Sequence, residues 1–289
     1  MILTIWDRSQ SLVAGRRAAC AALACALLFA FAGLANGQGG VVEPGAKPVL
    51  LADTFSFTEG PVADAKGNLY FTDQPNNRIY KWSTDGRLSV FMENAGRANG
   101  LFMDSAGNLY ACADERNELW KIDPSGAVTV LVKEFEGKRL NGPNDLWIDP
   151  KGGIYFTDPY YQRDYWAHKS MPQDGQHVYY LTPDRSRLIR VATGFQQPNG
   201  IAGTPDGRRL YIADIRAQRT WVYDIQPDGS LAGKRLFTER GSDGMTIDAE
   251  GKLWIAMWDG WKVTRWDPAP GGSAPGGPAG RLLESIAVP

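Results

Sequence analysis

One short sequence unit recurs five times along this chain, and it constrains the fold more than any other feature. Each copy begins with a polar residue and a short apolar run, has a glycine eight positions after the polar residue, and places an aromatic residue three or four positions after the glycine. The five lead residues are Glu59, Asn99, Asn144, Asn199 and Asp243, and the five glycines are Gly67, Gly107, Gly152, Gly207 and Gly251.

Each copy predicts a strand, a tight turn and a second strand. Four copies have aspartate five positions after the lead residue, and Thr204 takes this place in the fourth copy. An Asp-x-x-Gly turn followed by an aromatic residue on a buried face is typical of a β-meander. The copies begin 40, 45, 55 and 44 residues apart, which is the length of a β-propeller blade. A two-sheet sandwich needs no such phased repeat, so it is much less favoured than a propeller.

The lead residues are predicted to form a ring. In a propeller the first strand of each blade lines the central channel, so residues at its start meet at one mouth of that channel. The alternative is local, because Asn-Gly and Asp-Gly are common turn dipeptides. We favour the ring because every copy already has its turn further along the chain.

The ring favours a divalent cation. Glu59 and Asp243 offer carboxylates, and Asn144 and Asn199 offer amide oxygens. Such all-oxygen sets suit Ca²⁺, Mg²⁺ or Mn²⁺ better than a structural Zn²⁺. The chain has 2 histidines, neither of them in the ring phase, and it lacks a G-x-S-x-G nucleophile motif. A cation beside a carboxylate base could therefore activate water.

The N-terminal segment predicts export. Arg16 and Arg17 precede an apolar run that ends in small residues, which is typical of a signal peptide over residues 1–35. The alternative is a membrane anchor of similar length. Cleavage would leave Cys112 as the only cysteine, so no intramolecular disulfide is expected. The formal net charge of -1 gives no reason to expect nucleic acid or an anionic membrane as partner. Residues 36–47 read as a linker, and residues 48–289 as the propeller domain.

The motifs within the copies resemble those of the gluconolactonase and regucalcin (senescence marker protein) family. They are T-E-G-P-V from Thr58, K-R-L-N-G-P-N-D from Lys138, F-T-D-P from Phe156, Q-P-N-G from Gln197 and S-D-G-M-x-x-D from Ser242. The resemblance runs from about Phe57 to Pro268. It implies an all-β, six-bladed propeller that hydrolyses sugar lactones with a divalent metal.

The resemblance also implies roles for single residues. Glu59, Asn144, Asn199 and Asp243 surround the metal, and Asp243 is the catalytic base. Asn99, Arg97 and Asn141 lie where substrate hydroxyls bind. Animal members place an arginine at the position of Gly142, so sugar recognition is expected to differ here. The insertion from Tyr160 to Gln176 forms either a lid over the site or a rim beside it.

The sequence departs from the family in showing five copies instead of six. A Gly- and Pro-rich stretch follows Trp266, and one apolar strand from Arg281 comes after it. We therefore expect a propeller that lacks most of its last blade and is C-terminally truncated relative to the family. In family members an N-terminal strand completes the last blade, and Val49–Phe55 is the candidate for that strand.

These observations lead to one main functional prediction. The chain is expected to be an exported, periplasmic or secreted lactonase of the gluconolactonase type, with a small lactone as its partner. Its cofactor is expected to be a divalent cation, either Ca²⁺ or one of Mg²⁺, Mn²⁺ and Zn²⁺. The alternatives are a metal-dependent aryl- or phospho-ester hydrolase of the same propeller class, and a non-catalytic calcium-binding propeller.

Overall fold

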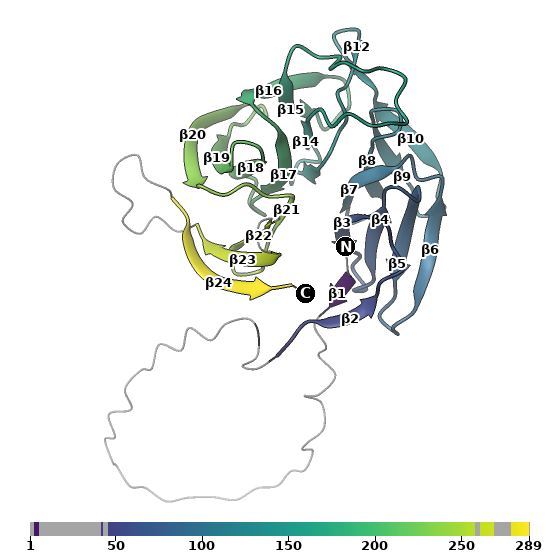
Figure 1. Ribbon diagram of the computed structural model, residues 1–289. Coiled ribbons are helices and arrows are strands. Elements are labelled where there is room, and N and C mark those ends of the chain that lie inside the picture. The colour runs from purple at the N-terminus through teal and green to yellow at the C-terminus, as the bar shows by residue number, and fades with distance from the viewer. Residues whose placement is uncertain (1–2, 6–41, 43–45, 258–260, 269–278, 289) are drawn as a thin grey trace, which may run out of the picture.

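The described part of the chain forms a β-propeller of five blades. The structure, a computed structural model, describes residues 3–5, 42, 46–257, 261–268 and 279–288. Within these ranges every regular element is a strand, and five four-stranded antiparallel sheets are arranged around a common centre (Figure 1). The all-β propeller prediction is confirmed.

In each blade the strands follow one another in chain order from the centre outward. The first blade comprises β3 (Thr58–Ala63), β4 (Leu69–Asp73), β5 (Arg78–Trp82) and β6 (Leu88–Glu93), and the second β7 (Ala98–Met103), β8 (Leu109–Ala113), β9 (Glu118–Ile122) and β10 (Val128–Val132). The third comprises β13 (Leu146–Ile148), β14 (Ile154–Asp158), β15 (Gln176–Leu181) and β16 (Leu188–Phe195). The fourth comprises β17 (Pro198–Gly203), β18 (Arg209–Asp214), β19 (Arg219–Ile225) and β20 (Leu231–Thr238), and the fifth β21 (Gly244–Ile247), β22 (Leu253–Met257), β23 (Lys262–Asp267) and β24 (Arg281–Ala287). Two further hairpins pair β1 (Leu3–Ile5) with β2 (Val49–Ala52) and β11 (Glu134–Phe135) with β12 (Lys138–Arg139).

The expectation of six blades is wrong for the described chain, which contains five. The apolar strand after the Gly- and Pro-rich stretch does not belong to a sixth sheet. It is β24, which pairs antiparallel with β23 and completes the fifth blade. Val49–Ala52 does not pair with that blade either, because its partner is β1. Blade number thus follows the number of inner strands, and each copy of the repeat supplies one.

The predicted N-terminal features lie almost wholly outside the described residues. These are the signal peptide over residues 1–35 and the linker over residues 36–47. Within the described part of the chain there is no helix long and apolar enough to span a membrane. Cys112 is buried with a free thiol, and burial raises the pKa of this thiol well above its ordinary value.

The turn of each copy forms as its residue types predict. The Asp64 carboxylate accepts hydrogen bonds from the backbone N–H groups of Lys66 and Asn68, both at 2.9 Å. Thr204 fills the same place with its hydroxyl, which accepts from the Arg208 and Arg209 amides at 3.3 and 3.0 Å. Side-chain acceptors of this kind satisfy the backbone in a tight reversal. The threonine copy therefore keeps the turn.

The core consists of four apolar clusters, each between two successive blades. The aromatic residues of the first four copies are buried in them: Tyr70, Tyr110, Tyr155 and Tyr211. Burying a large aromatic side chain contributes on the order of 2–3 kcal/mol. Trp254, the aromatic residue of the fifth copy, is only half-buried. The blades are therefore held together by side chains that the repeat places at one position.

Aspartate carboxylates at the ends of β4, β14 and β18 bind the backbone segments that lead into the inner strands. The carboxylate at the end of β14, Asp158, accepts from the Asn141 and Gly142 amides at 2.9 and 2.8 Å. Asp73 and Asp214 do the same in the first and fourth blades. These carboxylates hold the segments that lead to the ring residues.

We expect Asp158→Ala to destabilise the fold by at least ~2 kcal/mol, because two buried N–H groups lose their acceptor at roughly 1–3 kcal/mol each. Urea unfolding followed by tryptophan fluorescence measures this loss. Asp53→Ala, at an exposed position, is the matched control and is expected to leave the free energy of unfolding unchanged. Equal stability of the two variants would contradict the proposed clamp.

Candidate functional site

The five lead residues lie at the beginning of the inner strands, as the repeat predicts. Glu59, Asn99 and Asn199 are near the start of β3, β7 and β17. Asp243 directly precedes β21, and Asn144 lies two residues before the start of β13. All five therefore occupy the same end of the central channel.

The glycine that follows a lead residue allows the backbones of neighbouring blades to lie close together. A Cβ atom at Gly100 would lie 2.6 Å from the Asn144 carbonyl oxygen, which accepts the Gly100 N–H at 2.7 Å. A Cβ atom at Gly60 would likewise lie 2.5 Å from the Asn99 carbonyl oxygen. Only a residue without a side chain fits between two backbones this close. The Asn-Gly pairs are thus contacts between blades, and the local-turn alternative does not explain them.

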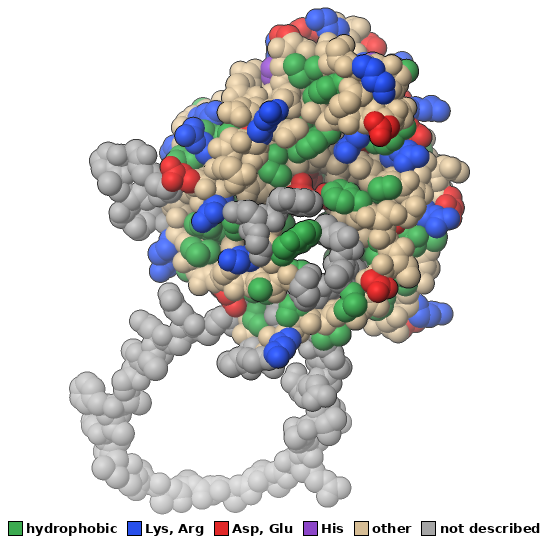
Figure 2. All heavy atoms as spheres, in the orientation of Figure 1, with side chains coloured by type: hydrophobic (Ala, Val, Ile, Leu, Met, Phe, Trp, Pro, Cys, Tyr) green, Lys and Arg blue, Asp and Glu red, His purple; other side chains and the backbone are tan. Residues whose placement is uncertain are grey.

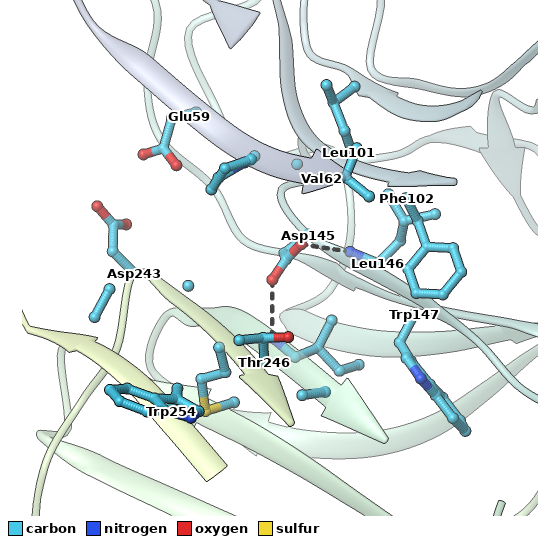
Figure 3. A pocket seen from close by; sticks show the side chains of 18 of the residues that line it. Glu59, Val62, Leu101, Phe102, Asp145, Leu146, Trp147, Asp243, Thr246 and Trp254 are labelled. Carbon is cyan, nitrogen blue, oxygen red and sulfur yellow. Dashed lines mark hydrogen bonds between the residues drawn. The ribbon is translucent and has the colours of Figure 1, made fainter. Parts of the chain in front are cut away.

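The inner strands enclose a cavity of about 570 Å³. Glu59, Asn99, Asn144 and Asp243 line it. Figure 3 shows Glu59 and Asp243 facing one another at one end, with Phe102 and Trp147 at the other. Four ring residues from four different blades are therefore brought into one cavity.

The Glu59 and Asp243 carboxyl groups face one another closely enough to influence each other's pKa (Figure 3). Burial raises the pKa of Glu59 well above its ordinary value, and the charges of Asp243 and Asp145 raise it further. Burial also raises the pKa of Asp243, while hydrogen bonds from Asn199 and Glu59 oppose this shift. Two acids this close retain a proton between them unless a cation compensates their charge. The pair is therefore a site for a proton or a cation.

The Asn199 side chain has two satisfied amide hydrogens and one unsatisfied oxygen. Its Nδ2 atom donates to Asp243 Oδ1 and to the Tyr161 hydroxyl oxygen, both at 2.9 Å. Its Oδ1 atom is buried and has no hydrogen-bond partner among the described residues. Buried polar atoms are normally satisfied, so an orphaned oxygen beside a carboxylate pair fits a cation ligand. Asn199, Glu59 and Asp243 therefore fit a cation, and the full set of four metal ligands, with Asn144, stays a prediction.

The described residues contain no group of three or more His, Cys, Asp or Glu side chains arranged to hold a metal ion. The reason lies in the donor set, because two of the four proposed ligands are amides. His168 and His177, the two histidines, do not line the cavity. The all-oxygen ligand set stays a prediction.

Asp145 is a third acid in the cavity, and sequence reasoning missed it. Its Oδ1 accepts the Leu146 N–H at 2.9 Å, and its Oδ2 accepts the Ile201 N–H at 3.0 Å (Figure 3). Burial raises the pKa of Asp145 to about 7, against these two hydrogen bonds. Asp145 directly follows the ring residue Asn144, and this position in the sequence could have indicated that it lies in the cavity. Asp145 joins the third and fourth blades and adds negative charge to the cavity.

The long loop of the third blade, residues 159–175, bridges the second and fourth blades. At one end Tyr161 contacts Asn199, and burial raises the pKa of Tyr161 to about 12. At the other end the buried Asp114 carboxylate accepts from Arg163 Nε at 2.9 Å and from the Tyr165 hydroxyl. The loop therefore reaches a ring residue and also packs on the neighbouring blade.

Two of the three residues predicted to bind substrate are engaged elsewhere. Asn141 is fully buried, and its amide donates to the Asp158 and Gly175 carbonyl oxygens and accepts from the Gln173 N–H. Arg97 donates to the Pro75 carbonyl oxygen at 2.8 Å, and its guanidinium lies over the Tyr165 ring. Neither lines the cavity, whereas Asn99 does. The roles of these residues in substrate binding stay predictions.

We expect Asp114→Ala to release the long loop, since Arg163 and Tyr165 lose a buried charged acceptor. Loss of hydrogen bonds to a charged group, worth roughly 1.5–3 kcal/mol each, raises the open population on the order of 10-fold or more. Limited trypsin digestion at Arg163 measures this opening. Glu115→Ala, at the exposed neighbouring residue, is the control and is expected to be cleaved at the rate of the unchanged protein. Protection of the loop in Asp114→Ala would contradict its anchoring role.

Comparison with known proteins agrees with this architecture. The pattern of the SMP-30/gluconolactonase/LRE-like region matches residues 57–274. The gluconolactonase of Zymomonas mobilis subsp. mobilis is 31% identical over 238 residues, which cover 72% of this chain and 66% of that enzyme. This chain therefore spans slightly less than two thirds of that relative.

Two further relatives are matched over more of their length. The L-arabinolactonase of Azospirillum brasilense is 32% identical over 255 residues, covering 86% of this chain and 79% of that enzyme. The structure of a gluconolactonase from Xanthomonas campestris superposes with a TM-score of 0.74 at 30% identity, covering 85% of this chain and 81% of that one. The chain belongs to the SMP-30/gluconolactonase/LRE-like family.

Proposed function

We propose that this protein hydrolyses a lactone to the hydroxy acid with the help of a divalent cation. The observation that carries the proposal is the cavity end at which Glu59 and Asp243 face each other beside the orphaned Asn199 Oδ1. The lactonase names of the relatives support the choice of substrate. A sugar lactone of the gluconolactone type is the first substrate to test.

The cation would be held by the carboxylates of Glu59 and Asp243 and by the amide oxygens of Asn144 and Asn199. Oxygen donors of this kind suit Ca²⁺, and Mg²⁺ or Mn²⁺ as alternatives. When bound, such a cation supplies Lewis-acid polarisation of a carbonyl oxygen and lowers the pKa of water.

The residues of the chain then have distinct tasks. Asp243 accepts a proton from the attacking water as the water oxygen bonds to the acyl carbon. The ring C–O bond then breaks, the leaving alkoxide takes that proton back from Asp243 to become a hydroxyl, and the carboxylic acid formed ionises to a carboxylate with release of one proton. Asn199 orients Asp243 through the 2.9 Å hydrogen bond to Oδ1. Asn99 lines the cavity and is placed to bind a substrate oxygen. Glu59 adds the second negative charge.

A substrate panel tests this function. Hydrolysis of several aldonolactones, an aryl ester and an aryl phosphotriester is followed by proton release, with and without a chelator. We expect chelator-sensitive turnover of at least one lactone at a higher kcat/KM than either ester. Faster phosphotriester or aryl-ester turnover would favour the esterase alternative. Cation binding without any turnover would favour a non-catalytic calcium-binding propeller.

Export completes the proposal. The basic, apolar and small-residue order over residues 1–35 supports a cleaved signal peptide and a periplasmic or secreted location. Fractionation of expressing cells, followed by N-terminal sequencing, tests it. A mature N-terminus after residue 35 in the periplasm or medium is expected, and an uncleaved chain in the membrane fraction would favour the anchor.

A further inference from the structure

The cavity has two chemically different ends. Its polar end carries Glu59, Asp243 and Asp145 with Asn99 and Asn144. The remainder is walled mainly by apolar and aromatic side chains, with Thr246 among them. Figure 3 shows Val62, Phe102 and Trp147 lying away from the Glu59–Asp243 pair. The hydroxyl groups of a polyhydroxylated sugar lactone find few hydrogen-bond partners along such walls.

The apolar walls follow from the phase of the repeat. Each inner strand begins with a polar ring residue and continues into an apolar run, so three residues beyond Glu59 and Asn99 the cavity meets Val62 and Phe102. Trp254 of β22, which pairs with Thr246, adds an aromatic side chain to the wall of the cavity on the fifth blade (Figure 3). Four of the five copies thus have an apolar residue three positions beyond the lead residue, and the fifth has Thr246 there.

The loop end of the channel is occupied by the protein's own side chains. The Tyr161 hydroxyl contacts Asn199 there, yet Tyr161, Arg163 and Tyr165 do not line the cavity. Figure 2 shows hydrophobic side chains near the centre of the ring of blades. The space that continues from the carboxylate pair therefore leads away from the loop and past apolar walls.

We propose that the preferred substrate is a lactone that carries an apolar alkyl or aryl substituent, with its ester group at Glu59 and Asp243 and the substituent against Val62 and Trp254. This inference rests on the proposed lactonase function and narrows its substrate class. The volume of about 570 Å³ exceeds what a single six-membered ring fills and lies in the ordinary range of small-molecule pockets.

The first experiment compares substrates that share one ring. The kcat/KM of δ-nonalactone, which has a butyl substituent, is measured beside those of unsubstituted δ-valerolactone and D-glucono-δ-lactone. We expect δ-nonalactone to exceed δ-valerolactone on the order of 10-fold or more, as a hydrophobic subsite of several methylenes provides. Equal or lower values for δ-nonalactone, with glucono-δ-lactone turned over well, would overturn this inference and leave the proposed function standing.

Variants at Val62 locate the effect. Val62→Phe narrows the apolar part and is expected to reduce the preference for δ-nonalactone about 10-fold, whereas Val62→Ala is expected to maintain it. The paired controls are Val90→Phe and Val90→Ala on the outer strand β6, where Val90 is exposed. Identical substrate ratios in the Val62 and Val90 pairs would overturn the assignment.

A binding measurement separates this inference from catalysis. Titration calorimetry of the Asp243→Ala variant with δ-nonalactone and δ-valerolactone requires no turnover. Tighter binding of δ-nonalactone, weakened by an added Val62→Phe, supports the apolar subsite even if no lactone is hydrolysed. No turnover of any lactone together with this binding difference would overturn only the proposed function.

Discussion

Removal of divalent cations is expected to abolish lactone hydrolysis and to lower the melting temperature. Without a cation, Glu59 and Asp243 remain close, and Asn199 Oδ1 remains buried without a partner. A bound cation at 100 times its Kd stabilises the folded state by about 2.7 kcal/mol. Activity and thermal unfolding are measured after chelation and again after addition of Ca²⁺, Mg²⁺ or Mn²⁺.

The rise in melting temperature on cation addition is expected to depend on the ring carboxylates. Glu59→Gln removes one charge from the pair and is expected to weaken the cation-dependent rise in melting temperature. Glu93→Gln alters an exposed ion pair with Arg78 and serves as the matched control. Full activity in chelator, or an equal cation response in Glu59→Gln and the unchanged protein, would rule out the metal assignment.

Replacement of Asp243 is expected to give the largest loss of activity among single variants. Asp243→Ala removes the proposed base, and loss of a positioned general base lowers kcat by roughly 10²- to 10⁴-fold. Asp243→Asn preserves an oxygen for the Asn199 Nδ2 donor and is expected to be equally impaired, because an amide does not accept the proton. Hydrolysis is measured at saturating cation, with binding of the cation confirmed by calorimetry.

Although these variants are expected to lose activity, Asp243→Asn is not expected to lose stability. Burial raises the pKa of Asp243 above its unfolded value, so its ionised form lowers folded-state stability as pH rises through the folded pKa. In chelator at alkaline pH, Asp243→Asn is therefore expected to unfold at a temperature no lower than the unchanged protein. Undiminished hydrolysis by Asp243→Ala would overturn its role as the base.

Much of the candidate site was accessible from the repeat. The offset of eight residues between lead residue and glycine places Glu59 and Asp243 in the same phase, although 184 residues separate them in the sequence. Equal phase means equal depth along the channel in a propeller, and the structure brings both to one cavity. The repeat did not mark Asp145, because an acid beside a ring residue is not itself repeated in the other copies.

Contacts between separate blades could not be predicted from the sequence. Tyr161 meets Asn199 because a loop of the third blade crosses to the fourth, and Asp114 anchors that loop from the second. No local pattern specifies where a long, irregular loop lands. The half-buried position of Trp254 is a similar case, since its pattern equals that of the buried tyrosines.

The sequence by itself determined the strand-turn-strand unit, its five copies and the common phase of the ring residues, since turn chemistry and side-chain alternation are local. Tertiary structure decided the number of blades, because only strand pairing shows that Arg281–Ala287 joins β23. It also decided that the ring carboxylates open onto an apolar cavity. Both features depend on which surfaces meet in space, and residues far apart in the chain set that together.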